Sequence, residues 1–175
     1  MKKFDVKRIL GTVIGVVTVV AILFVIDGKA EKELLGTWAY SYTTEYVEDL
    51  DVELTEYFEV TEGRYRWYMD REETKASLLK AYDEYFKSQE ITEEDVISSG
   101  YESIEDCKAQ WLEEDLKNIV DDYNEDPGAG SWQINQGTFL FIEDGTSREY
   151  KTEYRIEDGN TLYLQTDGLI LTKVK

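Results

Sequence analysis

Three Asp-Gly pairs near the C-terminus constrain the fold of this chain more than any other feature. They are Asp144-Gly145, Asp158-Gly159 and Asp167-Gly168, and each lies between runs of alternating apolar and polar residues. Asp-Gly favours the tight turns of β-hairpins, because glycine adopts a left-handed backbone conformation at no steric cost. Three such turns in succession predict an antiparallel meander. The strands expected here cover residues 132–134, 138–142, 149–156, 161–164 and 169–174.

The preceding part of the domain predicts three further strands and then a helical region. The expected strands cover residues 38–44, 54–60 and 64–69, and the expected helices cover residues 71–89 and 103–123. Apolar residues alternate in the strands and recur at the helical period in the helices. We therefore expect a mainly β fold, α+β overall: an eight-stranded antiparallel up-and-down β-barrel of three plus five strands, with a helical insertion at 71–125. A two-sheet sandwich is the alternative.

An apolar segment precedes this domain. Residues 9–26 are eighteen consecutive residues without a charge, after the basic residues Lys2, Lys3, Lys7 and Arg8. A helix of this length matches the hydrocarbon core of a bilayer, and the basic residues place its N-terminus inside. We expect a cytoplasmic basic stub at 1–8, a transmembrane helix and signal anchor at 9–26, a linker at 27–35 and an extracytoplasmic domain at 36–175. The alternative is a secreted protein cleaved near Ala30.

Composition excludes several classes of function. The formal net charge is −19, which disfavours nucleic acid as a partner and favours cationic peptides or proteins. The chain has no histidine, which excludes histidine-based catalysis and histidine metal ligands. Cys107 is the only cysteine, so no internal disulfide forms, and its helical pattern indicates a core residue.

Several segments resemble small bacterial lipocalin-like, or calycin-type, extracytoplasmic domains of unknown function. Leu34-Leu-Gly-Thr-Trp38 is similar to the Gly-x-Trp signature before the first lipocalin strand, and the segments 130–134, 137–141, 154–164 and 171–173 resemble the closing strands. The resemblance implies that Trp38 packs across the closed end of a barrel, against Lys173 or Lys175. It also implies a cup for a small ligand, although typical lipocalins lack the insertion between the third and fourth strands.

Two sets of residues are candidates for binding. The first would face the barrel interior and line a pocket for a small apolar ligand, or fill the barrel as plain core. It consists of Trp38, Tyr40, Tyr65, Trp67, Trp132, Phe139, Phe141, Tyr154 and Leu162. The second would dock the helical insertion on the barrel or present a surface to a partner. It consists of Trp111, Tyr82, Tyr85 and Phe86.

No pattern predicts catalysis, a cofactor or a metal site. The segment 122–128 begins like an EF-hand loop, but its glycine is displaced and Gln133 occupies the position of the bidentate glutamate. We therefore expect a membrane-anchored, extracytoplasmic, non-enzymatic binding or accessory module for a small apolar ligand or a cationic peptide or protein. The alternative is a structural or interaction subunit with a solid barrel, whose helical insertion recruits a membrane partner.

Overall fold

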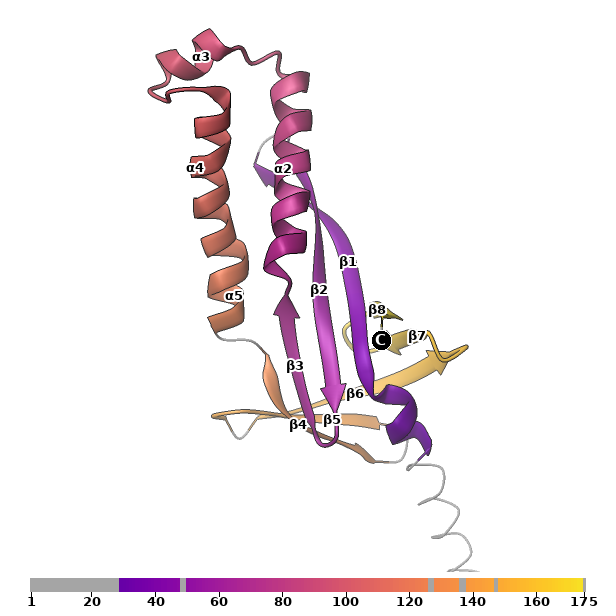
Figure 1. The fold of residues 1–175 in the computed structure, drawn as a ribbon. Helices are drawn as coiled ribbons and strands as arrows, with labels where there is room; N and C mark the ends of the chain where they lie inside the picture. Colours follow the sequence, from indigo (N-terminus) through magenta and orange to yellow (C-terminus); the bar gives the residue numbers. More distant parts are fainter. Residues whose placement is uncertain (1–28, 48–49, 126–127, 136–137, 147, 175) are drawn as a thin grey trace, which may run out of the picture.

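The protein is a closed β-barrel that carries a helical arm. The computed structural model describes residues 29–47, 50–125, 128–135, 138–146 and 148–174 (Figure 1). The strands are β1 (Gly36–Val47), β2 (Leu50–Thr61), β3 (Arg64–Met69), β4 (Ala129–Asn135), β5 (Thr138–Glu143), β6 (Glu149–Glu157), β7 (Thr161–Leu164) and β8 (Leu169–Lys173). They follow one another in chain order round the barrel, and β8 pairs with β1 to close it. The predicted barrel of three plus five strands is confirmed.

The helical insertion lies between β3 and β4, as predicted. Its elements are α2 (Arg71–Ser88), α3 (Glu93–Ser98), α4 (Ile104–Leu116), the π-helical turn η1 (Lys117–Asp121) and α5 (Asp122–Glu125). The Asp70 side chain caps α2 by accepting from the Glu73 amide at 2.9 Å. Thr92 and Asp95 cap α3 reciprocally, because each side chain accepts from the other's backbone amide. These caps satisfy amides that have no partner within the helix.

The N-terminal part of the fold prediction needs correction. Among the residues that the structure describes, no helix is both long enough and apolar enough to cross a membrane. The expected transmembrane helix at 9–26, the basic stub at 1–8 and the first residues of the linker lie outside the described residues. Within them, residues 29–34 of the linker are helical.

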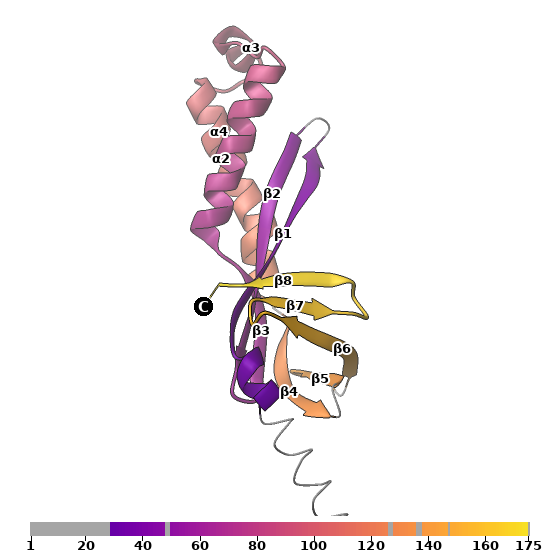
Figure 2. The ribbon, with the colours of Figure 1, turned by 90° about the vertical axis from the view of Figure 1, so that its right-hand side faces the viewer.

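Strands β1 and β2 are longer than the sequence patterns predicted. We expected them to end at Thr44 and to begin at Leu54, but their pairing continues to Val47 and Leu50. Acidic residues between these positions made the segment resemble a loop, whereas Asp51 and Glu53 are exposed on one face of β2 while Val52 is buried on the other. The two strands thus extend beyond the barrel as a ribbon, and α2 packs along it (Figure 2).

The helix at residues 29–34 covers one end of the barrel. Leu34 is fully buried there, and its carbonyl accepts from the Trp38 indole N–H at 2.8 Å. The Lys173 ammonium lies 4.8 Å from the centre of the Trp38 ring and donates to the Glu33 carbonyl at 3.0 Å. This is the contact between tryptophan and a basic residue of the last strand that the lipocalin resemblance implied. We call this the closed end.

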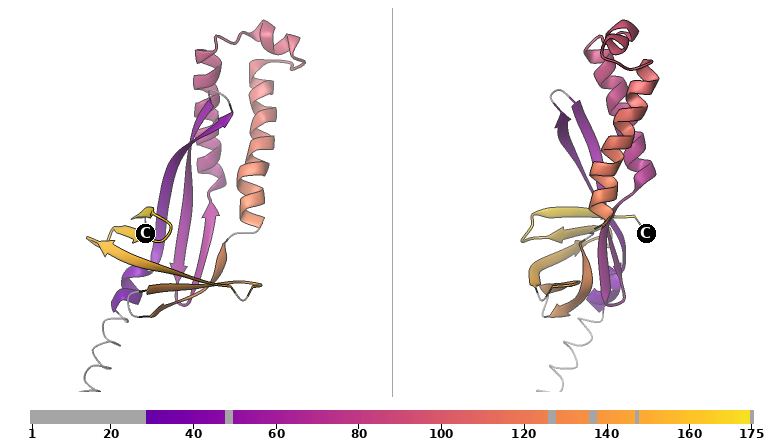
Figure 3. Two further views of the ribbon diagram at one scale, coloured as in Figure 1. Left: turned by 180° about the vertical axis from the view of Figure 1, so that it is seen from behind. Right: turned by 90° about the vertical axis from the view of Figure 1, so that its left-hand side faces the viewer.

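Three clusters of buried side chains stabilise the two parts of the molecule. The barrel core includes Trp38, Phe58 and Phe139, whereas a second core between the ribbon and the helices includes Val52, Leu78 and Tyr82. A third, smaller cluster of Phe86, Val96 and Cys107 lies where α2, α3 and α4 meet. We call α2 to α5 the helical arm and the third cluster its tip, which lies far from the barrel in every view (Figures 1 and 3).

Asn124 joins the base of the arm to the barrel. Its amide oxygen accepts from the Met69 N–H and its amide nitrogen donates to the Met69 carbonyl, both at 3.0 Å. A single side chain therefore satisfies both backbone groups of the last residue of β3, much as a neighbouring strand would. This pair of bonds fixes α5 beside the point where the chain leaves the barrel.

Candidate functional site

The aromatic side chains that we expected around a ligand cup contact one another inside the barrel. The ring centroid of Phe139 lies 4.1 Å from that of Phe141 and 5.1 Å from that of Trp132, which are packing distances. The buried members of the set are Trp38, Tyr65, Trp132, Phe139, Phe141 and Leu162, and Tyr40, Trp67 and Tyr154 are partly buried against them. All nine therefore contribute to the barrel core, the second of the two roles that their sequence pattern allowed.

The four aromatic residues expected at a partner surface divide into two groups. Tyr82 is fully buried between the ribbon and the helices, where its hydroxyl donates to Asp115, so it is not part of a surface. Tyr85, Phe86 and Trp111 instead reach the tip of the arm. There they line a pocket of about 310 Å³ between α2, α3 and α4. We call it the tip pocket.

Aromatic and aliphatic side chains make up most of the lining of the tip pocket. Trp111 contacts Phe86 with ring centroids 5.4 Å apart, and its indole N–H donates to the Tyr101 hydroxyl at 3.1 Å. The complete lining is Tyr85, Phe86, Ile91, Asp95, Val96, Ser99, Tyr101, Cys107 and Trp111. Of these, Ile91 and Val96 were not predicted from the sequence, because they stand in short segments without a clear periodicity.

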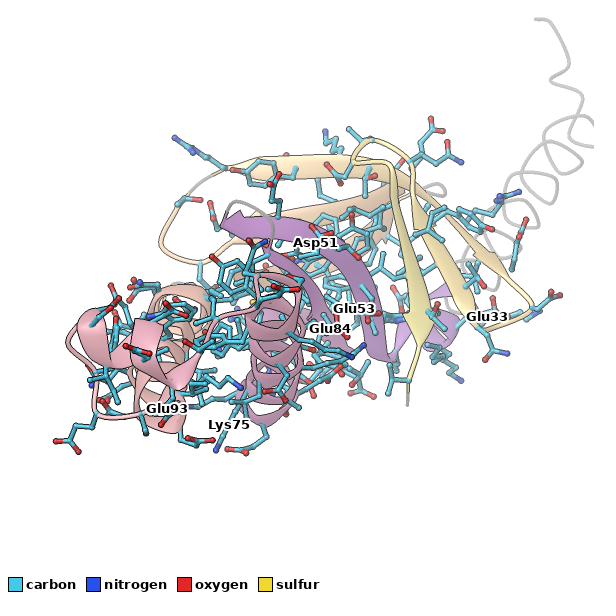
Figure 4. All side chains as sticks on the ribbon, turned by 90° about the horizontal axis from the view of Figure 1, so that it is seen from above. Glu33, Asp51, Glu53, Lys75, Glu84 and Glu93 are labelled. Carbon is cyan, nitrogen blue, oxygen red and sulfur yellow. The ribbon has the colours of Figure 1, made fainter. Side chains whose placement is uncertain are left out.

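Acidic side chains dominate the segments that form the tip pocket. Those exposed to solvent are Glu90, Glu93, Glu94, Asp95, Glu102 and Glu105. Only two basic residues occur between positions 87 and 108, and one of them, Lys108, forms an ion pair with Asp83. Figure 4 shows Glu93 on the arm, well separated from Asp51 and Glu53 of the ribbon. The tip is thus an apolar pocket in a strongly negative surface.

Cys107 lines the tip pocket, and its surroundings do not favour the thiolate form. Its side chain is buried, and this burial raises the pKa of the thiol above its ordinary value. A nucleophilic cysteine requires the opposite shift, because the thiolate is the reactive form. Cys107 therefore has the role of a small core residue that the sequence predicted.

A second pocket opens at the barrel end opposite Trp38. It has a volume of about 220 Å³ and is lined by Tyr65, Trp67, Gly128, Phe141, Glu143, Tyr150, Leu164 and Asp167. Three of these, Tyr65, Trp67 and Phe141, belong to the set expected to line a ligand cup. Of the others, Glu143, Tyr150 and Leu164 lie near the ends of β5, β6 and β7, whereas Gly128 and Asp167 lie outside the strands. We call it the mouth pocket.

Two further hollows, between the ribbon and α2, are more polar. They share Asp51, Ala81 and Glu84 and have volumes of about 110 and 220 Å³. No group of three or more cysteine, aspartate or glutamate side chains placed to hold a metal ion is found in the part of the chain that the structure describes. The two apolar pockets are therefore the stronger candidates for binding.

Comparisons with protein-family models, with curated proteins and with solved structures find no match to this chain. The closed eight-stranded antiparallel barrel is consistent with a lipocalin-like fold. The features that bear on function are therefore the two apolar pockets and the negative charge of the molecule.

Proposed function

We propose that this protein is a non-enzymatic, extracytoplasmic interaction module of the lipocalin-like class, whose helical arm binds a basic segment of a peptide or protein. The observation that carries the proposal is the tip pocket, which combines an apolar interior of about 310 Å³ with acidic surroundings. Pockets of this size accept a single large side chain or a small ligand. The extracytoplasmic location is carried over from the N-terminal sequence.

The tip pocket is suited to a partner segment that carries both an apolar side chain and positive charges. An apolar or aromatic side chain of the partner would enter between Phe86, Val96 and Trp111 and displace water from them. Lysine or arginine side chains beside it would face the acidic residues of α3 and of the loop before α4. Ile97, which is 54% exposed on α3, adds apolar surface next to the pocket. This is the pattern of an apolar anchor with a charged rim that peptide-binding grooves use.

A carrier of small apolar ligands, the other function expected from the sequence, has less support. Such a carrier needs a sizeable internal cavity, whereas most of the aromatic side chains expected to line one pack against each other as core, and only Tyr65, Trp67 and Phe141 also line the mouth pocket. The interaction module is therefore the function that the geometry favours.

The test measures binding of a labelled peptide by fluorescence anisotropy. The probe is a helical peptide with lysine on one face and leucine on the other, added to the full chain. We expect saturable binding that weakens as salt rises, because ions screen exposed charges. A peptide with serine in place of leucine should bind much more weakly. Equal binding of both peptides would show that charge alone attracts them and would overturn the proposal.

Matched charge variants locate the binding surface. The variant Glu94→Gln with Glu102→Gln removes two exposed carboxylates at the tip, and we expect about fivefold weaker binding, as for a few surface ion pairs lost together. The control Glu62→Gln with Glu153→Gln removes the same charge from exposed positions on the barrel and should bind like the unaltered protein. If both variants weaken binding equally, the tip is not the site.

A further inference from the structure

The mouth pocket has aromatic walls that continue from the barrel core. Tyr65 and Phe141 contact each other with ring centroids 4.9 Å apart, in an edge-to-face arrangement. Trp67 stacks on Phe58 with centroids 4.6 Å apart, so the core supports the indole from behind. Tyr150, which is 49% exposed, stands at the rim. The pocket is thus lined by aromatic rings that pack against the core, and the more exposed ring of Tyr150 lies at its edge.

Gly128 leaves the space in front of Trp67 open. A Cβ at this position would lie 3.3 Å from Cδ1 of the indole, tighter than ordinary van der Waals contact. The Gly128 carbonyl accepts from the Trp67 amide at 2.9 Å, so the backbone cannot move away without losing that bond. Any side chain at position 128 would therefore crowd the indole and reduce the pocket.

Two carboxylates, Glu143 and Asp167, line the same pocket. The Glu143 carboxylate accepts from the Thr146 hydroxyl at 3.2 Å, which holds it at the end of β5. The neighbouring Asp144 is already paired with Arg64. Burial of Tyr65, followed by the charges of Glu143 and Asp144, raises the pKa of its hydroxyl. The pocket therefore combines π-faces with negative charge.

We propose that the mouth pocket binds a small organic cation through a substituted ammonium group, such as trimethylammonium. Aromatic faces attract such cations through the ring quadrupole, and carboxylates at the rim complete the charge balance. The volume of about 220 Å³ is below that of sites for drug-sized molecules, so the pocket fits a headgroup of this size. This site is distinct from the tip pocket, and neither proposal depends on the other.

The experiment is isothermal titration of the full chain with choline and with tetramethylammonium. The matched probe is the uncharged isostere of choline, in which a tert-butyl group replaces trimethylammonium. We expect saturable one-to-one binding of the two cations and at least tenfold weaker binding of the isostere. Absence of saturable binding of both cations, or equal binding of the isostere, overturns the proposal. Phosphatidylcholine vesicles that compete with choline would assign the ammonium group to a lipid headgroup, and vesicles that do not compete would assign it to a free cation.

Variants with a matched control place the binding site. Asp167→Asn with Glu143→Gln removes both charges while preserving the turn, because Asn-Gly favours the same hairpin geometry as Asp-Gly. We expect about tenfold weaker binding of choline from the loss of both charges. The control Asp158→Asn makes the same change in the Asp-Gly turn that joins β6 to β7, at the closed end of the barrel, and should leave choline binding unchanged. Equal loss in the control would overturn the proposal, and peptide binding at the tip should survive in all these variants.

Discussion

At the scale of single residues, Glu56 marks the boundary between the two large cores. It stands on the inward face of β2, between Leu54 of the arm core and Phe58 of the barrel core. Its carboxylate accepts from the Tyr42 hydroxyl at 2.9 Å and from the Tyr123 hydroxyl at 3.0 Å. A partly buried carboxylate is tolerated because both of its oxygens have donors. The sequence pattern alone did not distinguish Glu56 from a solvated acid.

These bonds predict a stability that falls at alkaline pH. Burial, followed by the charge of Glu56, raises the pKa of Tyr42 to about 12, from about 10 when unfolded. The neutral hydroxyl therefore contributes fully to the free energy of unfolding below about pH 10, and this contribution is lost as pH rises toward 12. Urea unfolding across this window should show a shallower decline for Tyr42→Phe than for the unaltered protein. If the free energy of unfolding declines equally with pH in both proteins, the Tyr42 hydroxyl does not cause the loss of stability.

At the scale of elements, local signals explain which segments were predicted correctly. The Asp-Gly turns lie within hairpins whose two strands are close in sequence, so β5 to β8 matched their predicted ranges within two residues. The ends of β1 and β2 were missed, because the acidic ribbon becomes strand only where α2 covers its apolar face. Likewise, Tyr85, Phe86 and Trp111 were predicted as a set, but only the packing of three helices turns them into a pocket.

The junction between α5 and β3 depends on Asn124. The variant Asn124→Ala would leave the Met69 N–H and carbonyl without their partners, and unpaired backbone groups of this kind cost about 1–3 kcal/mol. We expect chemical denaturation to show a loss of this size in the free energy of unfolding. Asn118→Ala, at an exposed position of η1, is the control and should change stability by less than about 0.5 kcal/mol. Similar losses of stability in both variants would show that the bonds from Asn124 to Met69 have no special role in stability.

At the scale of the whole molecule, the barrel and the arm are two packed units that meet along the β1–β2 ribbon and at the junction of α5 with β3. Their cores share no buried residue, and the chain leaves the barrel at Met69 and returns at Gly128, close to the backbone of β3. The barrel core therefore stays complete without the arm, while the ribbon would lose its cover. This arrangement lets the arm present its tip far from the barrel.

Excision of the arm tests this division. In this variant, a short Gly-Ser linker replaces residues 71–127, and Leu50→Thr and Val52→Thr make the uncovered ribbon more polar. We expect the variant to unfold cooperatively, at a lower temperature than the full chain. It should retain binding of choline and lose binding of the lysine–leucine peptide. Circular dichroism during heating provides the measurement. A non-cooperative transition would show that the barrel needs the arm to fold.

By itself, the sequence determined the antiparallel meander, the order of three strands, helices and five strands, and the acidic character of the molecule. Each of these depends on neighbours in the chain or on composition, where turn chemistry and periodicity act directly. The tertiary structure decided that the aromatic residues pack together inside the barrel, that Glu56 is satisfied by two tyrosines, and where the tip and mouth pockets open. These features arise from contacts between residues distant in sequence, and a single chain pattern does not specify which faces meet.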